Sequence, residues 1–181
     1  IKKNKAIGVL MKDEKKIYAK NIVSNAGIMT TYNKLLPSAT VEKHQLTQQL
    51  QKVKQSVAHA SLYIGLEGTP ESLQLPKTNY WIYPAEGDHD TCATNYLEDL
   101  SQPFPVVYLS FPSAKDPDWS NRYPGKSSID IITLIPYETF EKWANTPWKK
   151  RGAEYESLKE AFAQRLLNEL YKQLPQVKGK I

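Results

Sequence analysis

The sequence predicts an α/β (α+β) domain, with a mainly antiparallel or mixed sheet of four or more strands and helices packed on one face. Short runs rich in β-branched and aromatic residues recur along the chain and have the length of strands. The segment 154–174 repeats apolar residues at the three-to-four spacing of an amphipathic helix. A content of 40% hydrophobic residues in 181 allows one sizeable core.

The first 27 residues predict a meander of three short strands. Gly8–Met11 and the run that begins at Lys16 are separated by the charged turn Lys12–Lys15. A third run ends in the small residues Ser24–Gly27. Such a meander buries little core of its own.

Two helices are expected next. Met29–Leu36 is a short helix that Pro37 ends, because the proline ring removes an amide donor and clashes inside a helix. Val41–Val53 has a narrow apolar stripe among Lys, Gln and Glu, which is typical of a surface helix.

Four strands follow. In Val57–Leu66 the even-numbered positions are apolar, whereas the odd-numbered face is amphipathic and suits either solvent or the wall of a cavity for an apolar ligand. The other three are Asn79–Tyr83, Val106–Phe111 and Ile129–Ile135. The helix Glu154–Leu174, which Pro175 ends, completes the prediction.

The connections carry weaker signals. Pro70–Pro76 and Ser113–Lys126 are rich in turn residues, and we expect them to be lid or rim segments or simple connections. Asp88-His89-Asp90 is better explained by a turn and a helix N-cap at Asp90, leading into Thr91–Leu97, than by a metal site, because contiguous residues cannot all face one ion. No metal site is predicted.

Composition excludes some classes of function. The net charge of +5 comes from 24 Lys and Arg interspersed with 19 Asp and Glu, and the basic clusters at Lys2–Lys5 and Lys149–Arg151 stand far apart. Nucleic acid is therefore not an expected partner, whereas contact with an anionic membrane surface is compatible with the charge. The lone Cys92 favours a reducing compartment, and no apolar run has the length of a membrane span. We expect a cytoplasmic protein, with membrane association open for the intact enzyme. Because the sequence starts at Ile1 and breaks off after Val177–Ile181, which is typical of a turn into a strand, we expect an internal fragment.

Several segments, in order along nearly the whole chain, resemble FAD-dependent oxidoreductases of the phytoene dehydrogenase-related and retinol saturase-like family. They are Lys16–Gly27, Tyr32–Pro37, Tyr63–Gly68, Asn79–Pro84, Phe104–Pro117 and Trp148–Gly152. The resemblance implies that residues 1–27 are the remnant of an FAD-binding domain and that 28–181 are a substrate-binding domain, truncated at its C-terminus. The implied activity is desaturation, saturation or isomerisation of double bonds in carotenoids, retinoids or other isoprenoid lipids.

The sequence departs from this family at the phosphate site, and the family's C-terminal segment that closes over the flavin ring is expected to lie beyond Ile181. The Gly-x-Gly-x-x-Gly turn that holds a dinucleotide pyrophosphate at a helix N-terminus is absent, and Gly65-Leu66-Glu67-Gly68 lacks the third glycine. We therefore expect FAD to be bound mainly by an upstream domain, and the fragment alone to be inactive.

The resemblance also implies candidate site residues. Ser24, Asn25 and Ala26 are expected to let the backbone approach FAD, the alternative being a small-residue crossover between domains. A substrate-lining role is expected within a set of aromatic residues and one histidine, the alternative being ordinary sheet packing: His59, Tyr63, Tyr80, Trp81, Tyr83, Tyr108 and Phe111. No catalytic side chain is predicted, because the flavin supplies the hydride chemistry. The rival hypothesis is a free-standing module that binds an apolar ligand or a protein without redox activity.

Overall fold

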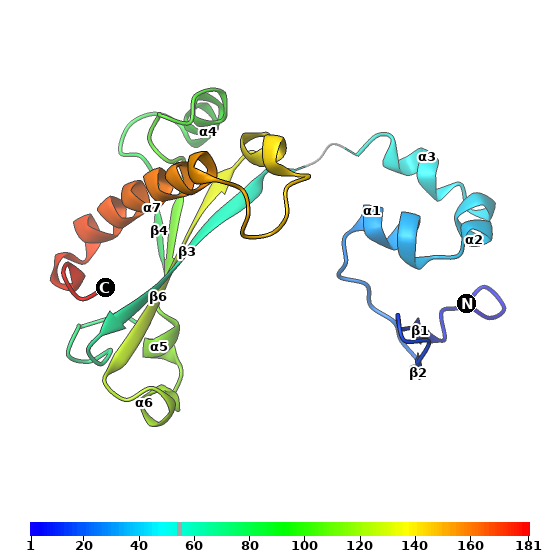
Figure 1. Ribbon diagram of the computed structural model, residues 1–181, viewed down its shortest axis with the longest axis horizontal. Coiled ribbons are helices and arrows are strands. Elements are labelled where there is room, and N and C mark those ends of the chain that lie inside the picture. The colour runs from blue at the N-terminus through cyan, green and yellow to red at the C-terminus, as the bar shows by residue number, and fades with distance from the viewer. Residues whose placement is uncertain (54–55) are drawn as a thin grey trace. The chain divides into compact units, whose positions relative to one another are not determined.

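The computed structural model describes residues 1–53 and 56–181. They form two compact units, Ile1–Ser56 and Val57–Ile181 (Figure 1). The boundary predicted after residue 27 is a different one. It separates two domains of a larger enzyme, and it stays a prediction.

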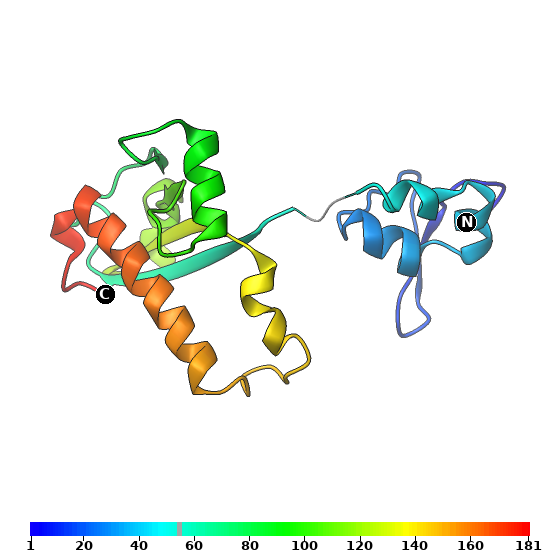
Figure 2. The same ribbon diagram turned by 90° about the horizontal axis from the view of Figure 1, so that it is seen from above.

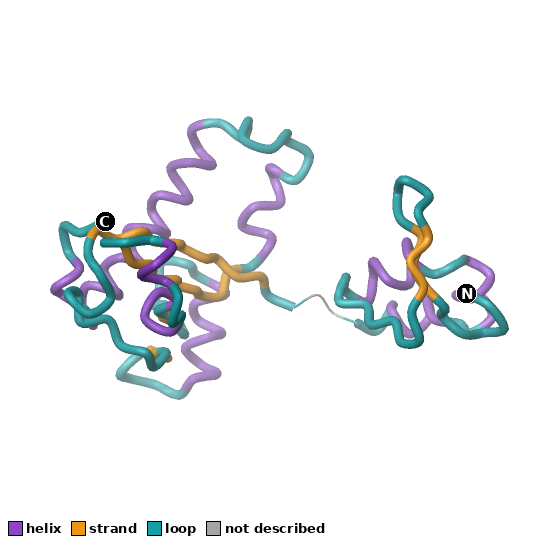
Figure 3. The backbone as a smooth tube through the Cα atoms, turned by 90° about the horizontal axis from the view of Figure 1, so that it is seen from below, coloured by secondary structure: helices purple, strands orange, loops and turns teal. Residues whose placement is uncertain are grey.

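The N-terminal unit begins with a small hairpin. β1 (Gly8–Leu10) pairs antiparallel with β2 (Lys16–Tyr18), and the two strands are the orange segments of this unit in Figure 3. The predicted third strand is wrong, since residues 21–25 are not in a strand and Val23 is 90% exposed. A strand needs a partner for its amides, and none pairs with this segment in the described part of the chain.

Of the two predicted helices of this unit, the first is observed within one residue of its bounds and the second is divided. α1 (Ile28–Thr30) continues into a π-helical turn that ends at Leu35, before Pro37 as expected. The single predicted helix 41–53 is wrong, because it is divided into α2 (Ser38–Lys43) and α3 (Leu46–Leu50). Gln45 has a φ of 52°, and a left-handed residue cannot continue a right-handed helix.

The C-terminal unit is built on a four-stranded sheet. Its strands are β3 (Ala58–Glu67), β4 (Tyr80–Ile82), β5 (Val107–Ser110) and β6 (Lys126–Ile135), in the order β3-β6-β5-β4. Every pairing is antiparallel. The predicted α/β class with an antiparallel sheet is therefore confirmed.

Four helices accompany the sheet: α4 (His89–Glu98), α5 (Pro112–Lys115), α6 (Trp119–Arg122) and α7 (Ala153–Gln173). In Figure 2, α4 and α7 lie on the same side of the sheet, toward the viewer. α7 runs within one residue of its predicted bounds at either end. Short 3₁₀ turns occupy Tyr137–Trp143 and Pro175–Val177.

The N-cap of α4 differs from the prediction by two residues. The carboxylate of Asp88, and not that of Asp90, accepts a hydrogen bond of 2.9 Å from the Thr91 amide. Hydrogen bonding from the Thr91 side chain, and then from its amide, lowers the pKa of Asp88, because it stabilises the ionised form. Asp90 lies in the first turn, where a negative charge is favourable.

The core fills the space between the sheet and the helices. Ile129 and Ile131 of β6 are fully buried, and α7 contributes Leu166 and Leu170. The hydroxyl of Tyr96, on α4, donates a 3.1 Å hydrogen bond to the Leu134 carbonyl of β6 and so ties α4 to the sheet. Burial raises the pKa of this phenol to about 12, although the charge of Arg165 opposes the shift.

The two expected lid segments are both structured. Leu73 and Leu75 are buried in the core, so segment 70–76 is packed in place and is not an open flap. Segment 113–126 contains most of α5 and all of α6, and the Ser113 hydroxyl donates to the Ser128 carbonyl at 3.1 Å. Among the described residues, no helix combines the length and the apolar character needed to cross a membrane.

Candidate functional site

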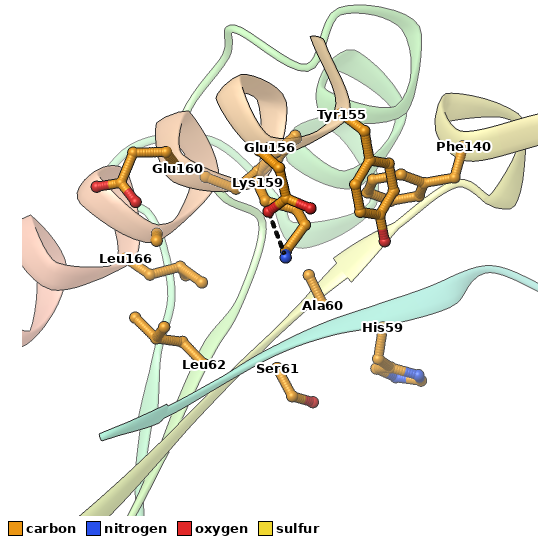
Figure 4. A pocket seen from close by; sticks show the side chains of 12 residues that line it. His59, Ala60, Ser61, Leu62, Phe140, Tyr155, Glu156, Lys159, Glu160 and Leu166 are labelled. Carbon is orange, nitrogen blue, oxygen red and sulfur yellow. Dashed lines mark hydrogen bonds and ion pairs between the residues drawn. The ribbon is translucent and has the colours of Figure 1, made fainter. Parts of the chain in front are cut away.

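One face of the sheet is left open by the helices of its own unit. Along β3 the side chains alternate, and Figure 4 shows Ala60 and Leu62 on the side of α7 whereas His59 and Ser61 point away from it. On the open side Tyr63 is 74% exposed. Large side chains that stay this exposed on a sheet indicate a surface available for binding.

A groove of about 560 Å³ lies on this open face. Its lining comes from all four strands or from residues next to them: His59, Ser61, Asn79, Trp81, Val106, Tyr108, Ile132, Thr133 and Leu134. Trp81 and Tyr108 are cross-strand partners, and their ring centroids lie 4.7 Å apart. Tyr108 in turn faces Ile132 on β6. The floor is therefore an aromatic and aliphatic row that crosses three strands.

The lining is suited to binding and not to proton transfer. Aromatic rings offer apolar contact area, and their polar tips can orient a ligand. The groove contains His59 but no acidic residue, so it lacks the paired acid and base of a hydrolytic site. A surface of this kind fits an elongated apolar ligand.

The structure brings only part of the predicted substrate-lining set together. His59, Trp81 and Tyr108 line the groove, and Tyr63 is on the same face without lining it. Their contact with a substrate stays a prediction.

The other three predicted residues lie elsewhere. Tyr80 and Phe111 face the core, where their rings pack edge to face at 5.5 Å, and Phe111 is fully buried. Tyr83 follows the end of β4 and packs its ring against His89 at 5.1 Å. A strand turns alternate residues to opposite faces, so neighbours such as Tyr80 and Trp81 cannot share one wall.

Several lining residues escaped the sequence prediction, Ile132 and Leu134 among them. Five of the seven residues of the strand 129–135 are apolar and they fall on both faces, so its sequence does not show which residues face the core. Only the pairing with β3 places the odd-numbered residues inside. The alternation in β3 does show its two faces, and together with this register it locates Ile132 and Leu134 on the open face.

Polar groups gather around Asn79, which is one of the lining residues of the groove. The Lys115 ammonium, on α5, donates to the Ser110 hydroxyl at 3.0 Å and to the side-chain carbonyl of Asn79. Asp130 lies next to Ser110 across the β5–β6 pair. Burial raises the pKa of the Asp130 carboxyl, and the charge of Lys115 partly offsets this shift. Of these four residues only Asn79 lines the groove.

A second cavity, of about 450 Å³, lies between the edge strand β3 and the first half of α7 (Figure 4). Ala60 and Leu62 form its floor, and the Glu156–Lys159 ion pair of 2.9 Å lies at its helix side. Because Glu156 and Lys159 already pair with each other, the cavity offers a ligand fewer free hydrogen-bonding groups than the groove does.

The predicted cofactor residues lie in the N-terminal unit. Ser24, Asn25 and Ala26 are exposed and precede α1. The Ser24 hydroxyl lies 2.6 Å from that of Thr31, which donates to the Gly27 carbonyl at 2.8 Å. Ser24 is thus engaged in the turn that starts the helix, while the small residues at 25 and 26 leave the main chain accessible. Among the described residues, no three His, Cys, Asp or Glu side chains converge in a way that would hold a metal ion.

Comparison with known proteins identifies relatives over almost the entire chain. All-trans-retinol 13,14-reductase is 37% identical in Homo sapiens over 98% of this chain, and 34% identical in Danio rerio over 97%. Prolycopene isomerase of Arabidopsis thaliana is 29% identical over 94%. No protein-family model and no solved structure matches. The chain spans about 30% of the length of the reductases. It is therefore a retinol saturase-like segment, homologous to one part of these longer proteins.

Proposed function

We propose that residues 57–181 bind the substrate of an oxidoreductase that acts on double bonds of retinoid, carotenoid or other isoprenoid lipids. The observation that carries this proposal is the aromatic groove on the open face of the sheet, where Trp81 and Tyr108 form a continuous apolar surface. A conjugated polyene is flat, long and apolar, and it packs well on such rings. The names of the relatives support the same class of ligand.

FAD is the cofactor that the family resemblance implies. Its flavin accepts or donates a hydride, while the protein supplies binding, orientation and a dry cavity. The accessible main chain at Asn25 and Ala26 fits a minor contact with such a group. Because the chain has no Gly-x-Gly-x-x-Gly turn, we propose that most of the FAD site belongs to another part of the enzyme and that this chain alone is inactive.

Binding of all-trans-retinol by the 181-residue chain tests the proposal. We expect energy transfer from tryptophan to the bound polyene, and we expect Trp81→Ala to weaken binding at least tenfold. Trp148→Ala is the matched control, because Trp148 is also exposed, at 76%, but does not line the groove. Equal binding by the wild type and by Trp81→Ala would place the ligand elsewhere and refute the proposal.

The redox part of the proposal needs its own measurement. A protein of the relatives' length that contains this chain is expected to purify with flavin absorbance, while the chain alone is colourless. In that protein, Trp81→Ala should lower kcat/KM for the polyene with little change in flavin content. A colourless longer protein would contradict an FAD enzyme.

A free-standing binding module is the second candidate. A Danio rerio relative, 34% identical over 97% of this chain, is named an inactive all-trans-retinol 13,14-reductase, so the similarity extends to a protein described as lacking the reaction. Ligand binding by the longer protein without flavin or turnover would favour the module over the enzyme.

A further inference from the structure

The sheet has two edges of very different length. β4, at one edge, has three residues, whereas β3, at the other, has ten. Proteins usually protect a long edge with proline, lysine or a bulge, because its unpaired amides can pair with another strand. Residues 58–66 contain neither proline nor lysine, and their pairing with β6 has no bulge. β3 therefore presents an edge that can accept a further strand.

One end of this edge is already paired. The Glu67 amide donates a 2.8 Å hydrogen bond to the Lys180 carbonyl, so the chain that leaves α7 meets the last residue of β3 (Figure 2). Because this bond directs the Glu67 amide away from β6, every second residue of β3 also directs its main-chain N–H and C=O groups outward. In the described part of the chain, the outward residues without a main-chain partner are His59, Ser61, Tyr63 and Gly65.

The pairing with β6 agrees with this alternation. Ser128 lies opposite Gly65, and its amide donates to the Ser113 hydroxyl at 3.0 Å instead of to β3. The Leu134 carbonyl, opposite His59, accepts its hydrogen bond from α4. The hydrogen-bonding groups of the odd-numbered residues of β3 therefore lie on the free edge.

The 450 Å³ cavity opens at the same edge. His59 and Ser61 line it although their side chains point away from it in Figure 4, so the cavity reaches the main chain of the strand. Its floor, Ala60 and Leu62, is only half-buried, and Ala163 on the helix side is also small. Space with an apolar floor therefore lies next to the unpaired main-chain groups.

The bond to Lys180 also sets the direction and register of a strand added here. β3 ends at Glu67, so a chain that continues along the edge from Lys180 runs antiparallel to β3. Opposite residues of an antiparallel pair place their side chains on the same face. Lys180 is thus on the open face and Ile181 on the face of α7, which suits a charged and an apolar residue. The fourth and sixth residues after Ile181 then lie opposite Leu62 and Ala60, at the cavity.

We propose that the edge of β3 binds the polypeptide that follows Ile181 in a protein of the relatives' length, as a fifth, antiparallel strand whose inward side chains fill the cavity. This chain spans about 30% of the length of the reductases, so such proteins contain further chain. A segment attached at Lys180 pairs within one molecule, which favours it over a second copy or a separate peptide. The inference goes beyond the binding of a substrate in the groove and does not depend on it.

Residue-resolved hydrogen exchange tests the proposal on the 181-residue chain and on a protein of the relatives' length that contains it. In the 181-residue chain the amides of Ser61, Tyr63 and Gly65 should exchange rapidly. Those of Leu62 and Ile64 are bonded to β6, and they are the internal controls that should be protected in both proteins. In the longer protein the three odd-numbered amides should exchange on the order of a hundredfold more slowly.

Two substitutions at one position isolate the outward amide. Tyr63→Pro removes this amide, and Tyr63→Ala is the matched control that removes the same side chain but keeps the amide. Proline is tolerated where the N–H faces a free edge, so both variants should keep Leu62 and Ile64 protected in the 181-residue chain. In the longer protein, Tyr63→Pro should restore rapid exchange at Ser61 and Gly65, whereas Tyr63→Ala should not.

Three results would overturn the proposal. The first is equal exchange of the odd-numbered amides in the two proteins. The second is slow exchange of these amides in a 181-residue chain that sediments as a dimer, because a second copy would then occupy the edge. The third is a charged residue at both the fourth and the sixth position after Ile181, since burying two charges over an apolar floor is unfavourable.

Discussion

Replacing a side chain of β3 with alanine should change the free energy of unfolding by very different amounts on the two faces of the strand. Ile64, 4% exposed, points into the core, whereas its neighbour Tyr63 is 74% exposed on the open face. Replacing Ile64 with alanine leaves a cavity and should lower the free energy of unfolding by about 2 to 5 kcal/mol. Only a quarter of Tyr63 is buried, and the corresponding loss at about 25 cal/mol per Å² is about 1 kcal/mol.

Urea unfolding followed by circular dichroism measures both variants. The change from a strand-favouring residue to alanine is shared by Ile64→Ala and Tyr63→Ala, so the difference between them reports burial. We expect Ile64→Ala to be less stable by at least 1 kcal/mol. If Tyr63→Ala costs as much as Ile64→Ala, the open face is covered in solution, and the reasoning that places a ligand groove there fails.

Two further predictions concern titratable groups. Tyr96→Phe removes the hydrogen bond to Leu134 and should cost about 1 kcal/mol at neutral pH. The raised pKa of Tyr96 means that the wild type gains stability from this group below pH 10, and that this gain is lost as the pH rises toward about 12. The phenylalanine variant should lack this loss in alkaline thermal melts, and equal alkaline slopes would contradict it. For Asp130, burial raises the pKa, so the ionised carboxyl costs stability at neutral pH and the cost disappears as the pH falls below its ordinary value near 3.8. Asp130→Asn should therefore raise the melting temperature at pH 7 but not in acid, whereas a lower melting temperature at pH 7 would show that the attraction to Lys115 outweighs burial.

The elements with strong periodicity were predictable from the sequence. The apolar spacing in 154–174 located α7 within one residue, because the same side chains that form the stripe are buried against the sheet. The alternation in 57–66 located both β3 and its two faces. In these segments the local pattern and the tertiary burial agree.

Other elements depended on contacts that the local sequence does not show. The break between α2 and α3 occurs at Gln45, which carries no glycine or proline signal. In the site, Tyr80, Trp81 and Tyr83 form an aromatic cluster in sequence, yet one residue faces the core, one faces the groove and one packs on His89. Aromatic residues suit both a core and a ligand surface, so only strand pairing distinguishes them.

Lys115 was not identified from the sequence for a related reason. It lies in the segment 113–126, whose proline and glycine content indicates a loop. Its hydrogen bond to Asn79, 36 positions earlier in the chain, forms only because α5 places it there. Polar ends of binding sites are often assembled from such distant segments, because loops carry side chains to the rim of a rigid sheet.

The uneven support beneath α7 has a consequence for its motion. Leu170 and Leu174 anchor the end of the helix in the core, while the 450 Å³ cavity extends beneath its first half, from Tyr155 to Leu166. At the far end, the carbonyl of Lys180 accepts a 2.8 Å hydrogen bond from the Glu67 amide, so the chain after the helix is fastened to the edge of β3. At its start, the Tyr155 ring packs on Phe140 and Trp143 at 5.9 and 5.2 Å, so the least supported part of the helix lies between this contact and the core residues. Amide hydrogens at 157–160 should exchange with deuterium faster than those at 166–173, and a ligand that fills the cavity should remove this gradient.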